Sequence, residues 1–433
     1  MTSDGARLRA AAAWSVTQVM RGRSLKSVLA LERSAFADPR DRALLEAIVL
    51  DTVRHRRRLE FALGRYMEKP LDRRDPTVHC LLLTGLAQLQ LLELPAHAAV
   101  SETVAAARLL GLGTRAGLIN AVLRRCQREG LPESADIAVS ESHPDWLVET
   151  LKADWPDDWQ EILRANNRIA PLWLRVNALH GGRDAVADAL RDTGLEVLLP
   201  DFPPQAVLVR NAIAPTRLPG WDAGAIAVQD RSAQMAGEAL SVRPGEAVWD
   251  MCAAPGGKSA QLVEARPAAL LLTDTEPARL ERIRELFQRL GMPQSDVILQ
   301  ALDATQPLPD DLPQAFDAIL LDAPCSATGI IRRQPDVKWH RQAKDIARLN
   351  LLQWRLLKNA WRHLKPGGRL LYSTCSVLKA ENSGLIGQFL EQHPDAAVLP
   401  LPERFGRVSG AGRQRLPGDD EGDGFFYALL ERN

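Results

Sequence analysis

The sequence predicts a multidomain protein with an all-α N-terminal domain, a small α+β module and an α/β, Rossmann-like C-terminal domain. Three observations predict this fold class: helical spacing of apolar residues in the first third, short strands around one helix in the middle, and strands that alternate with amphipathic helices towards the end. We place the domains at residues 1–131, 132–235 and 236–433, because a length of 433 residues suits about three domains.

The N-terminal domain is predicted from apolar residues that recur three and four positions apart through residues 7–127. Residues 78–94 are apolar on almost every side, which predicts the central buried helix of a bundle. Residues 1–130 carry 21 Lys and Arg against 13 Asp and Glu, although the whole chain has 54 of each. We expect this positive domain to contact nucleic-acid phosphates through residues 55–58 and 124–125, with a solvated surface as the alternative.

Strand and helix patterns predict the other two domains. The middle module has one expected helix and three expected strands, at residues 184–192 and at 172–176, 196–199 and 206–209. The C-terminal domain has five expected strands, with helices such as 278–290 and 346–364 between them, at residues 247–250, 268–274, 297–303, 318–322 and 369–374. Strands that alternate with helices in this way predict a parallel, doubly wound sheet with helices on both faces.

Aspartates end the first four strands of this predicted sheet, at Asp250, Asp274, Asp303 and Asp322. Ligands of open α/β sheets bind outside the carboxyl ends of the strands, although an aspartate there is also a common helix cap. Because four successive strands share the feature, we expect a binding site at this edge of the sheet.

The turn after the first strand, residues 250–259, carries Gly256 and Gly257 before a helix. Glycines allow a ligand to approach the backbone closely, and the free N–H groups of a helix start favour an anionic group. Cys252 stands where a Walker A loop requires glycine, and the turn lacks the spacing GxGxxG. We therefore expect a nucleoside cofactor that carries a carboxylate, with Asp274 at its ribose, and S-adenosyl-L-methionine has both groups.

The five cysteines are widely spaced in a chain without a secretion signal, so we expect no disulfide framework. The spacings CxxC, HxxxH and HExxH, which are typical of zinc sites, do not occur, so we expect no bound metal. Cys80 and Cys126 fall on predicted helices and are expected in the core. Cys325 and Cys375 follow the fourth and fifth strands and face one crevice if those strands are neighbours. A thiolate is the usual nucleophile when an intracellular enzyme adds to an unsaturated centre, so we expect chemistry from this pair. The residues alone leave open which thiol attacks.

Four segments carry a resemblance to a known family: DMCAAPGGKSAQL, DAPCSATGIIRRQPDVKW, LLYSTCSVLKAENS and GDGFFYALL. They resemble the RNA 5-methylcytosine methyltransferases. The resemblance covers nearly the whole chain, because SLKSVLALE and GLINAVLRR are similar to that family's NusB-like helical domain, and RVNAL and VQDRSAQ to its middle, RNA-binding module. It implies a methyltransferase fold for the last domain, S-adenosyl-L-methionine as cofactor, and 16S rRNA as substrate at cytosine 967, either free or in an assembling small subunit.

The resemblance also implies roles for individual residues. Cys375 matches the nucleophile that adds to C6 of cytosine, and Cys325 matches a second thiol that assists C5 deprotonation or product release. Asp322 is expected to hold the cytosine through N3 and N4. The implied cofactor pocket, with Asp303 towards the adenine, consists of Cys252, Ala253, Ala254, Pro255, Gly256, Gly257, Lys258, Asp274, Asp303 and Asp322.

Several expectations remain open at this point. Lys258 could take part in the site directly, or it could equally be a solvated lysine at the start of a helix. Three basic residues after the fourth strand are expected to contact phosphates beside the target base, namely Arg332, Arg333 and Lys338. We expect a cytoplasmic protein, because no segment near the N-terminus has the pattern of a secretion signal and no stretch reaches the roughly 20 apolar residues of a membrane span. We also expect a monomer. The alternatives are the same chemistry on tRNA or another rRNA site, and a non-catalytic RNA-binding scaffold.

Overall fold

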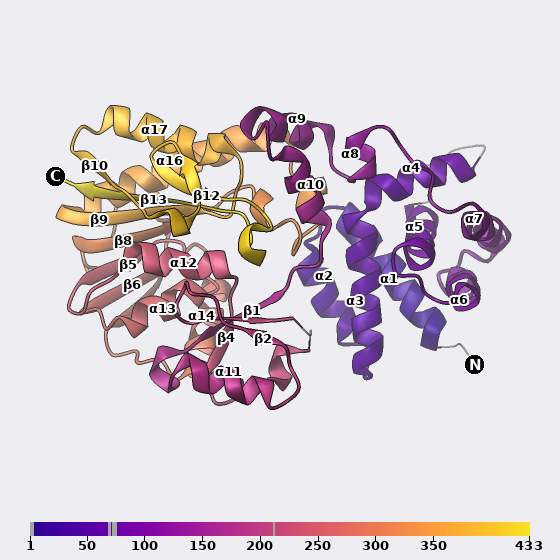
Figure 1. Ribbon diagram of the computed structural model, residues 1–433, viewed down its shortest axis with the longest axis horizontal. Helices are drawn as coiled ribbons and strands as arrows, with labels where there is room; N and C mark the ends of the chain where they lie inside the picture. The colour runs from indigo at the N-terminus through magenta and orange to yellow at the C-terminus, as the bar shows by residue number, and fades with distance from the viewer. Residues whose placement is uncertain (1–3, 68–70, 72–75, 211–212) are drawn as a thin grey trace. The chain divides into compact units, whose positions relative to one another are not determined.

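The computed structural model describes residues 4–67, 71, 76–210 and 213–433 (Figure 1). The chain forms two compact units. Unit 1 contains Met1–Arg168 and Ile331–Gln342, and unit 2 contains Ile169–Ile330 and Ala343–Asn433. The domain boundaries that we expect after residues 131 and 235 lie inside unit 1 and unit 2, respectively.

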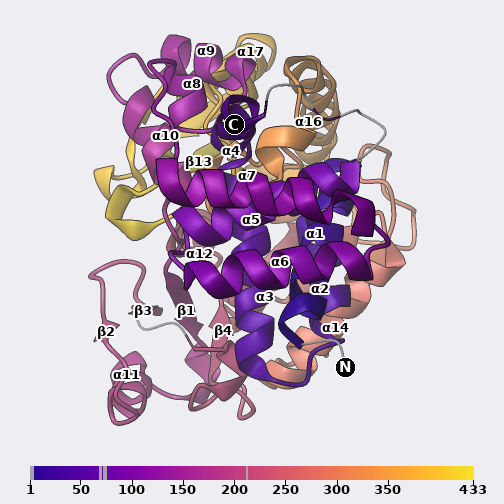
Figure 2. The same ribbon diagram turned by 90° about the vertical axis from the view of Figure 1, so that its right-hand side faces the viewer.

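Unit 1 is a bundle of helices, as the spacing of its apolar residues predicts. Its first part contains α1 (Asp4–Met20), α2 (Leu25–Arg33), α3 (Pro39–Arg54), α4 (Arg56–Tyr66), α5 (Pro76–Gln90), α6 (Ala96–Leu109) and α7 (Ala116–Glu129). Helix α5 is buried along most of its length, and α6 and α7 pack against it and against each other (Figure 2). The central helix expected at 78–94 is confirmed, although it ends at Gln90.

Local signals in the sequence explain where these helices begin and end. Pro39 is the first residue of α3, and the Asp38 side chain accepts a hydrogen bond from the backbone N–H of Arg40 at 2.8 Å. This satisfies a donor that the first helical turn leaves free. Helix α7 ends at Glu129, and the residue that caps it is Gly130, whose φ of 69° is in the left-handed region that favours glycine. The N-terminal part of unit 1 is completed by α8 (Ile137–Ser140), α9 (Asp145–Asp154) and α10 (Trp159–Asn167).

Residues 331–342 follow the loop of Cys325 in the chain but belong to unit 1, where they form α15 (Val337–His340). The indole N–H of Trp339 donates a hydrogen bond to the carbonyl of Val53 at 2.8 Å. The segment is therefore anchored among the helices of the bundle rather than exposed as a loop.

Lys338 has a position that its sequence context did not predict. Its side chain is buried, and Nζ donates to the carbonyls of Arg54 and Ser142 and to Oδ1 of Asn167 at 3.0, 3.1 and 2.7 Å. An ammonium group has three N–H donors, and these contacts use all of them. The expected contact of Lys338 with a phosphate is therefore wrong, and Arg332 is buried as well.

Unit 2 begins with the small α+β module. Its antiparallel sheet has the order β2-β3-β1-β4, and the elements are β1 (Leu172–Val176), α11 (Arg183–Arg191), β2 (Val197–Leu198), β3 (Ala206–Val209) and β4 (Ile226–Val228). Strands β1 and β3 have the predicted bounds. Strand β4 was not predicted, because three residues are too few to show an alternating pattern.

The large sheet of unit 2 follows α12 (Arg231–Leu240). Its strands are β5 (Ala247–Asp250), β6 (Ala269–Asp274), β7 (Val297–Ala301), β8 (Phe316–Asp322), β9 (Leu364–Thr374), β10 (Ala396–Leu399), β11 (Arg407–Ser409), β12 (Gly412–Arg415) and β13 (Phe425–Arg432). The order is β11-β12-β13-β9-β8-β5-β6-β7, and β10 pairs with β13. The run from β9 to β7 is parallel, as predicted, and antiparallel strands from the end of the chain extend the sheet beyond β9.

Helices cover both faces of this sheet (Figure 1). One face packs against α12, α13 (Gly257–Glu264) and α14 (Pro277–Leu290), and the other against α16 (Ala343–His363) and α17 (Ser383–Gln392). Successive residues of β5 illustrate the alternation, since Val248 belongs to the first core and Trp249 to the second. Because the strand order reverses between β5 and β8, the carboxyl ends of these strands form the crevice where such folds bind ligands.

Candidate active site

Cys325 and Cys375 follow two neighbouring strands, β8 and β9. These strands are parallel, with Asp322 opposite Ser373, so the loops after them leave the sheet at the same edge. The Sγ atoms of the two cysteines are 3.4 Å apart, and both are free thiols. The expectation that the fourth and fifth predicted strands are neighbours is confirmed, and this pairing brings the thiols together.

The surroundings of Cys325 favour its protonated form. The hydrogen bond with Cys375, followed by burial, raises the pKa of Cys325 well above the ordinary thiol value. Cys325 therefore holds its proton more tightly than a free cysteine does, and its S–H group can donate to the sulfur of Cys375. The raised pKa therefore suits Cys325 to the role of proton donor in this contact.

Asp322, at the end of β8, is half-buried between two polar partners. Lys258 Nζ donates to Oδ2 at 2.6 Å, and Ser373 Oγ donates to Oδ1 at 3.2 Å. Burial alone would lower the pKa of Lys258, but Asp322, with Cys375 and Asp250, outweighs burial and raises it. The lysine side chain is 15% exposed. Lys258 is thus a fixed cation beside Asp322 rather than a solvated residue.

The loop between β5 and α13 carries most of the predicted cofactor residues. Gly256 has a φ of 98°, and a Cβ there would lie 3.2 Å from Ile283, so a larger residue would be both strained and crowded. Asp250 is fully buried and accepts a hydrogen bond from Ser259 Oγ at 2.7 Å. Burial raises the pKa of Asp250 to about 7. These contacts hold the loop against the first turn of α13, whose free N–H groups favour an anion.

Asp274 ends β6, and its side chain is almost completely buried. Its Oδ1 accepts hydrogen bonds from Arg279 Nη1 at 3.1 Å and from the backbone N–H of Glu276 at 3.3 Å. Its Oδ2 is buried and has no hydrogen-bond partner among the described residues. A buried carboxylate oxygen without a donor is costly, and ribose hydroxyls would supply donors. The site therefore fits the nucleoside part of the expected cofactor.

Asp303 differs from the other strand-end aspartates. Strand β7 ends at Ala301, and Asp303 lies exposed in the loop beyond it. Its carboxylate accepts hydrogen bonds from the backbone N–H and Oγ1 of Thr305 at 2.9 and 2.8 Å, which lower its pKa. The expected strand at 297–303 is therefore too long, because Asp303 forms a local turn with Thr305.

Two cavities that share Cys252, Ala254 and Asp322 collect the predicted residues. The larger, of about 410 Å³, is also lined by both thiols, Asp274 and Asp303. The smaller, of about 170 Å³, is lined by Asp250 and by predicted loop residues, namely Ala253, Pro255, Gly257 and Lys258. Gly256 lines neither cavity, and its contribution is the shape of the turn.

Three residues near these cavities were not predicted. Arg279 pairs with Asp274, Ser373 donates to Asp322, and Glu381 bonds to the residues that follow the two cysteines. Arg279 belongs to none of the segments that carry the resemblance, whereas Ser373 and Glu381 lie in LLYSTCSVLKAENS. For all three residues, only the packing reveals their partners. One signal was available for Glu381: the dipeptide Cys-Ser occurs at both predicted thiol positions, so each loop offers a hydroxyl beside its cysteine.

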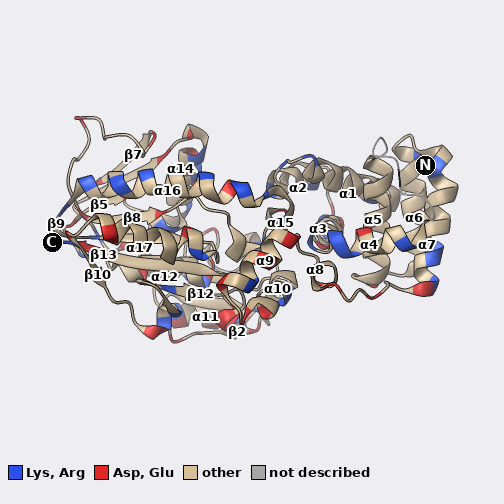
Figure 3. Ribbon diagram, turned by 90° about the horizontal axis from the view of Figure 1, so that it is seen from above, with Lys and Arg blue, Asp and Glu red and all other residues tan. Residues whose placement is uncertain are grey.

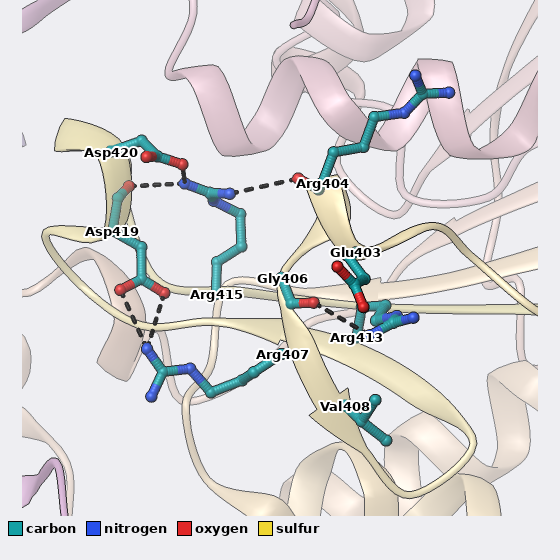
Figure 4. Close-up of a pocket in the computed structure, with 9 residues that line it drawn as sticks. All are labelled: Glu403, Arg404, Gly406, Arg407, Val408, Arg413, Arg415, Asp419 and Asp420. Atoms are coloured by element: carbon teal, nitrogen blue, oxygen red, sulfur yellow. Dashed lines mark hydrogen bonds and ion pairs between the residues drawn. The ribbon is translucent and has the colours of Figure 1, made fainter.

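A further cavity, of about 630 Å³, is lined by residues of β11, β12 and the turn after them, without any predicted site residue. Figure 4 shows that two of its four arginines are paired with carboxylates: Arg407 with Asp419, and Arg415 with Asp420. Because neither thiol lines this cavity, it is not a candidate for the chemistry.

The basic run expected at nucleic-acid phosphates is largely paired within unit 1. Arg56 Nε lies 2.8 Å from a Glu60 oxygen, and Arg57 Nη1 lies 2.7 Å from Asp145 Oδ1. Burial, helped by nearby positive charges, lowers the pKa of His55 to about 3, so this imidazole is neutral at physiological pH. Figure 3 marks further basic residues on α7, which are the better candidates for phosphate contacts.

Two features are absent from the part of the chain that the structure describes. Within that part of the chain, no helix combines the length and the apolar character that crossing a bilayer requires. The same residues contain no group of three or more His, Cys, Asp or Glu side chains arranged to hold a metal ion.

Models of known protein families match three segments of the chain. The model of the NusB family matches residues 6–128, and that of the RsmF/B-like ferredoxin-like domain matches residues 143–215. The model described as 16S rRNA methyltransferase RsmB/F matches residues 238–431.

Individual relatives agree with these matches. Ribosomal RNA small subunit methyltransferase B of Xanthomonas campestris is 47% identical, over 95% of this chain and 93% of the relative. The crystal structure of PH0851 has a TM-score of 0.84 over 100% of both chains, and at 24% identity it shows a common fold. That of a methyltransferase homolog protein from Pyrococcus horikoshii, 30% identical, has a TM-score of 0.60 over 69% of this chain and 98% of that one. The chain therefore belongs to the 16S rRNA methyltransferase RsmB/F family.

Proposed function

We propose that this protein transfers a methyl group from S-adenosyl-L-methionine to C5 of a cytosine in 16S rRNA. The observation that carries the proposal is the thiol pair, with the Sγ atoms of Cys325 and Cys375 3.4 Å apart in the cavity that Asp322 also lines. C5 of cytosine is a poor nucleophile until a group adds to C6, and a thiolate can make that addition. Membership of the family supports methyl transfer to rRNA.

Cys375 is the nucleophile in this proposal. Its thiolate forms a bond to C6, and the electron pair of the C5–C6 double bond then becomes available at C5. Asp322 holds the base through N3 and N4 and favours protonation at N3 as the bond forms. Lys258 keeps the Asp322 carboxylate in position through the 2.6 Å contact. S-adenosyl-L-methionine, when bound, supplies a methyl group that its positive sulfur makes electrophilic.

Cys325 acts at the end of the reaction. Once C5 carries the methyl group, its proton passes to a water molecule, the double bond forms again, and the bond between C6 and Cys375 breaks. The departing group is the Cys375 thiolate, and the S–H group of Cys325 can stabilise it through the contact between the two sulfurs. Loss of Cys325 is therefore expected to stall the release of product rather than the attack.

The cofactor is held, in this proposal, by the loop Cys252–Lys258 together with Asp274 and Asp303. The unpartnered Oδ2 of Asp274 supports a contact with the ribose. The target base has to be turned out of any helix before C6 can be reached, so an unpaired cytosine is expected. Cytosine 967 is the position that we propose, in free 16S rRNA or in an assembling small subunit, with a monomeric cytoplasmic enzyme.

Bisulfite sequencing of 16S rRNA and tRNA tests the function directly. We expect one 16S rRNA cytosine to lose its methylation in cells without the gene, and wild-type protein to restore it while the Cys375→Ala variant does not. Loss of methylation in tRNA alone would reassign the substrate. If no cytosine in either RNA changed, the proposal would fail and a binding scaffold would be the better description.

A further inference from the structure

We propose that Glu381 is a positioning residue that holds the two thiols at their spacing. Glu381 lies in the short helix η5 (Lys379–Glu381), after β9, and its side chain is fully buried. The consequence for catalysis rests on the proposed function, whereas the spacing of the thiols is a property of the protein alone.

The carboxylate of Glu381 joins the loops of both cysteines. Its Oε1 accepts a hydrogen bond from the backbone N–H of Ser326 at 2.8 Å, and its Oε2 accepts from the hydroxyls of Ser326 and Ser376 at 2.5 and 2.6 Å. Ser326 directly follows Cys325, and Ser376 directly follows Cys375. One buried group is therefore bonded to the residue after each thiol.

Other contacts prevent this carboxylate from moving. The amide nitrogen of Gln353, on α16, donates to Oε1 of Glu381 at 3.0 Å and to the carbonyl of Pro324 at 2.9 Å. The hydroxyl of Tyr372 donates to the backbone carbonyl of Glu381 at 2.7 Å. Both neighbours of Cys325 in the chain are thus held by the same small network.

The strands alone do not fix the distance between the sulfurs. Parallel pairing sets β8 and β9 about 4.8 Å apart, but it ends before the cysteines, whose loops have no ladder of their own. Without the Glu381 carboxylate, the donors of Ser326, Ser376 and Gln353 lose a common acceptor, and the loops have to rearrange to satisfy them. Reacting atoms need to be about 3–3.5 Å apart, and a displacement of about 1 Å costs about 100-fold in rate.

Substitutions separate this role from a general effect on stability. We expect Glu381→Ala to lower kcat about 100-fold, with the KM for RNA and the affinity for cofactor within about two-fold of wild type. Glu381→Gln keeps the size of the side chain and one acceptor oxygen, so its kcat should lie between those of Glu381→Ala and wild type. The matched control is Glu246→Gln, which disrupts a 2.6 Å ion pair with Arg369 at the opposite end of β5. This control should lower the melting temperature and leave kcat unchanged.

A double-mutant cycle tests whether Glu381 acts through the loop of Cys375. Ser376→Ala removes the hydroxyl that bonds to Oε2 of Glu381. If the bond carries the effect, Ser376→Ala should lower kcat in wild type but change it less than about two-fold in the Glu381→Ala background. Additive effects of the two substitutions would contradict the proposed connection.

The spacing of the thiols can also be measured without RNA. Phenylarsine oxide condenses with two neighbouring thiols, forming two As–S bonds and releasing one water, with no change of oxidation state. We expect the full-length wild type to bind it at Cys325 and Cys375, the Glu381→Ala variant to bind at least about 10-fold more weakly, and Cys375→Ala to lose this site. Peptide mass spectrometry identifies the labelled pair.

The two measurements distinguish the possible failures. If the wild-type protein methylates no cytosine but Glu381→Ala still binds the arsenical more weakly than wild type, the spacing role would be supported and the proposed function rejected. Unchanged kcat and unchanged arsenical binding in Glu381→Ala would overturn the inference, as would an equal loss of kcat in Glu246→Gln. If Glu381→Ala does not fold, the same measurements are made on Glu381→Gln. An arsenical affinity of Glu381→Gln within about two-fold of wild type would then reject the spacing role.

Discussion

The ammonium group of Lys258 lies 2.6 Å from Oδ2 of Asp322, and this contact joins the loop after β5 to the end of β8. Ser373, near the end of β9, donates to the other oxygen of the same carboxylate. Nζ of Lys258 also lies 5.0 Å from the centre of the Phe425 ring, a favourable position for a cation. Elements from four strands therefore fix one carboxylate beside the two thiols.

Replacing Lys258 tests the importance of this contact. A hydrogen bond to a charged group is worth about 1.5–3 kcal/mol, so Lys258→Met should lower kcat/KM for 16S rRNA by about 10- to 150-fold. Initial rates at saturating cofactor measure the effect. The control is Lys365→Met, which removes a 2.9 Å ion pair with Asp317 at the opposite end of β8 and should cost less than about two-fold. Equal activities of the two variants would exclude Lys258 from the site.

Asp274 is expected to be a main polar anchor of the cofactor. Asp274→Ala removes the buried oxygen that has no partner among the described residues, and it should weaken S-adenosyl-L-methionine binding by about 10- to 150-fold. Isothermal titration calorimetry measures the affinity, and circular dichroism checks the fold. Asp296→Ala, at an exposed carboxylate before β7, serves as the control. An unchanged affinity in Asp274→Ala would remove Asp274 from the pocket.

The order of bond making predicts opposite behaviour for the two cysteines. Cys375→Ala lacks the attacking thiol, so it should be inactive and form no covalent complex with RNA. Cys325→Ala can still attack and methylate, and it should accumulate a protein–RNA adduct that survives denaturing electrophoresis. The assay requires a reductant, because neighbouring thiols oxidise readily.

The adduct is a sharper test than activity, because misfolding would not create a covalent complex in only one variant. An adduct in Cys375→Ala and none in Cys325→Ala would assign the attack to Cys325. The raised pKa of Cys325 supports a role as proton donor, since a thiol that holds its proton tightly is a poor source of thiolate.

Asp250 predicts a pH dependence of stability. Its pKa is about 7 in the folded protein because of burial, against an ordinary value of 3.8. Between these two values the folded protein binds more protons than the unfolded chain. The free energy of unfolding should therefore fall as pH rises through this range, by up to about 1.4 kcal/mol per pH unit.

The variant Asp250→Asn isolates this effect. Asparagine cannot ionise, but its amide oxygen can still accept the hydrogen bond from Ser259. Urea unfolding between about pH 4 and about pH 8 should give a flatter dependence for Asp250→Asn than for wild type. Parallel curves for the two proteins would mean that Asp250 is ionised in the folded state throughout this range.

Helix α7 is the place to test RNA binding by unit 1. Arg128 is exposed and Arg124 is half-buried on this helix, whereas Arg125 is paired with Glu129 at 3.0 Å. Arg124→Ala with Arg128→Ala should weaken binding to 16S rRNA and reduce the slope of log affinity against log salt by about 0.7 per lost phosphate contact. An unchanged slope would place the RNA contacts elsewhere. Deleting the whole domain is a poorer test, because it also removes Val53, the hydrogen-bond partner of Trp339.

Much of the fold and of the candidate site was predictable from the sequence. Apolar periodicity depends only on which residues must be buried, so it located α5 and the parallel strands, and the bounds of β1, β3 and β5 agree with it. The thiols and the glycine turn were predictable because strand ends of an open α/β sheet always meet at one edge. Short elements such as β4, and loop positions such as Asp303, were missed because their conformation depends on a few local contacts.

The tertiary structure alone decided which side chains are partners. The sequence predicts that Lys338 contacts a phosphate, but its side chain is buried. It donates hydrogen bonds to Arg54, Ser142 and Asn167, which are far from it in the chain. Glu381 likewise is far from Ser326 in the chain, yet its carboxylate accepts hydrogen bonds from Ser326 and Ser376. Periodicity determines which face of an element is buried, whereas a hydrogen bond between distant segments depends on distances of a few tenths of an ångström. Those distances are fixed only when the strands and helices have packed.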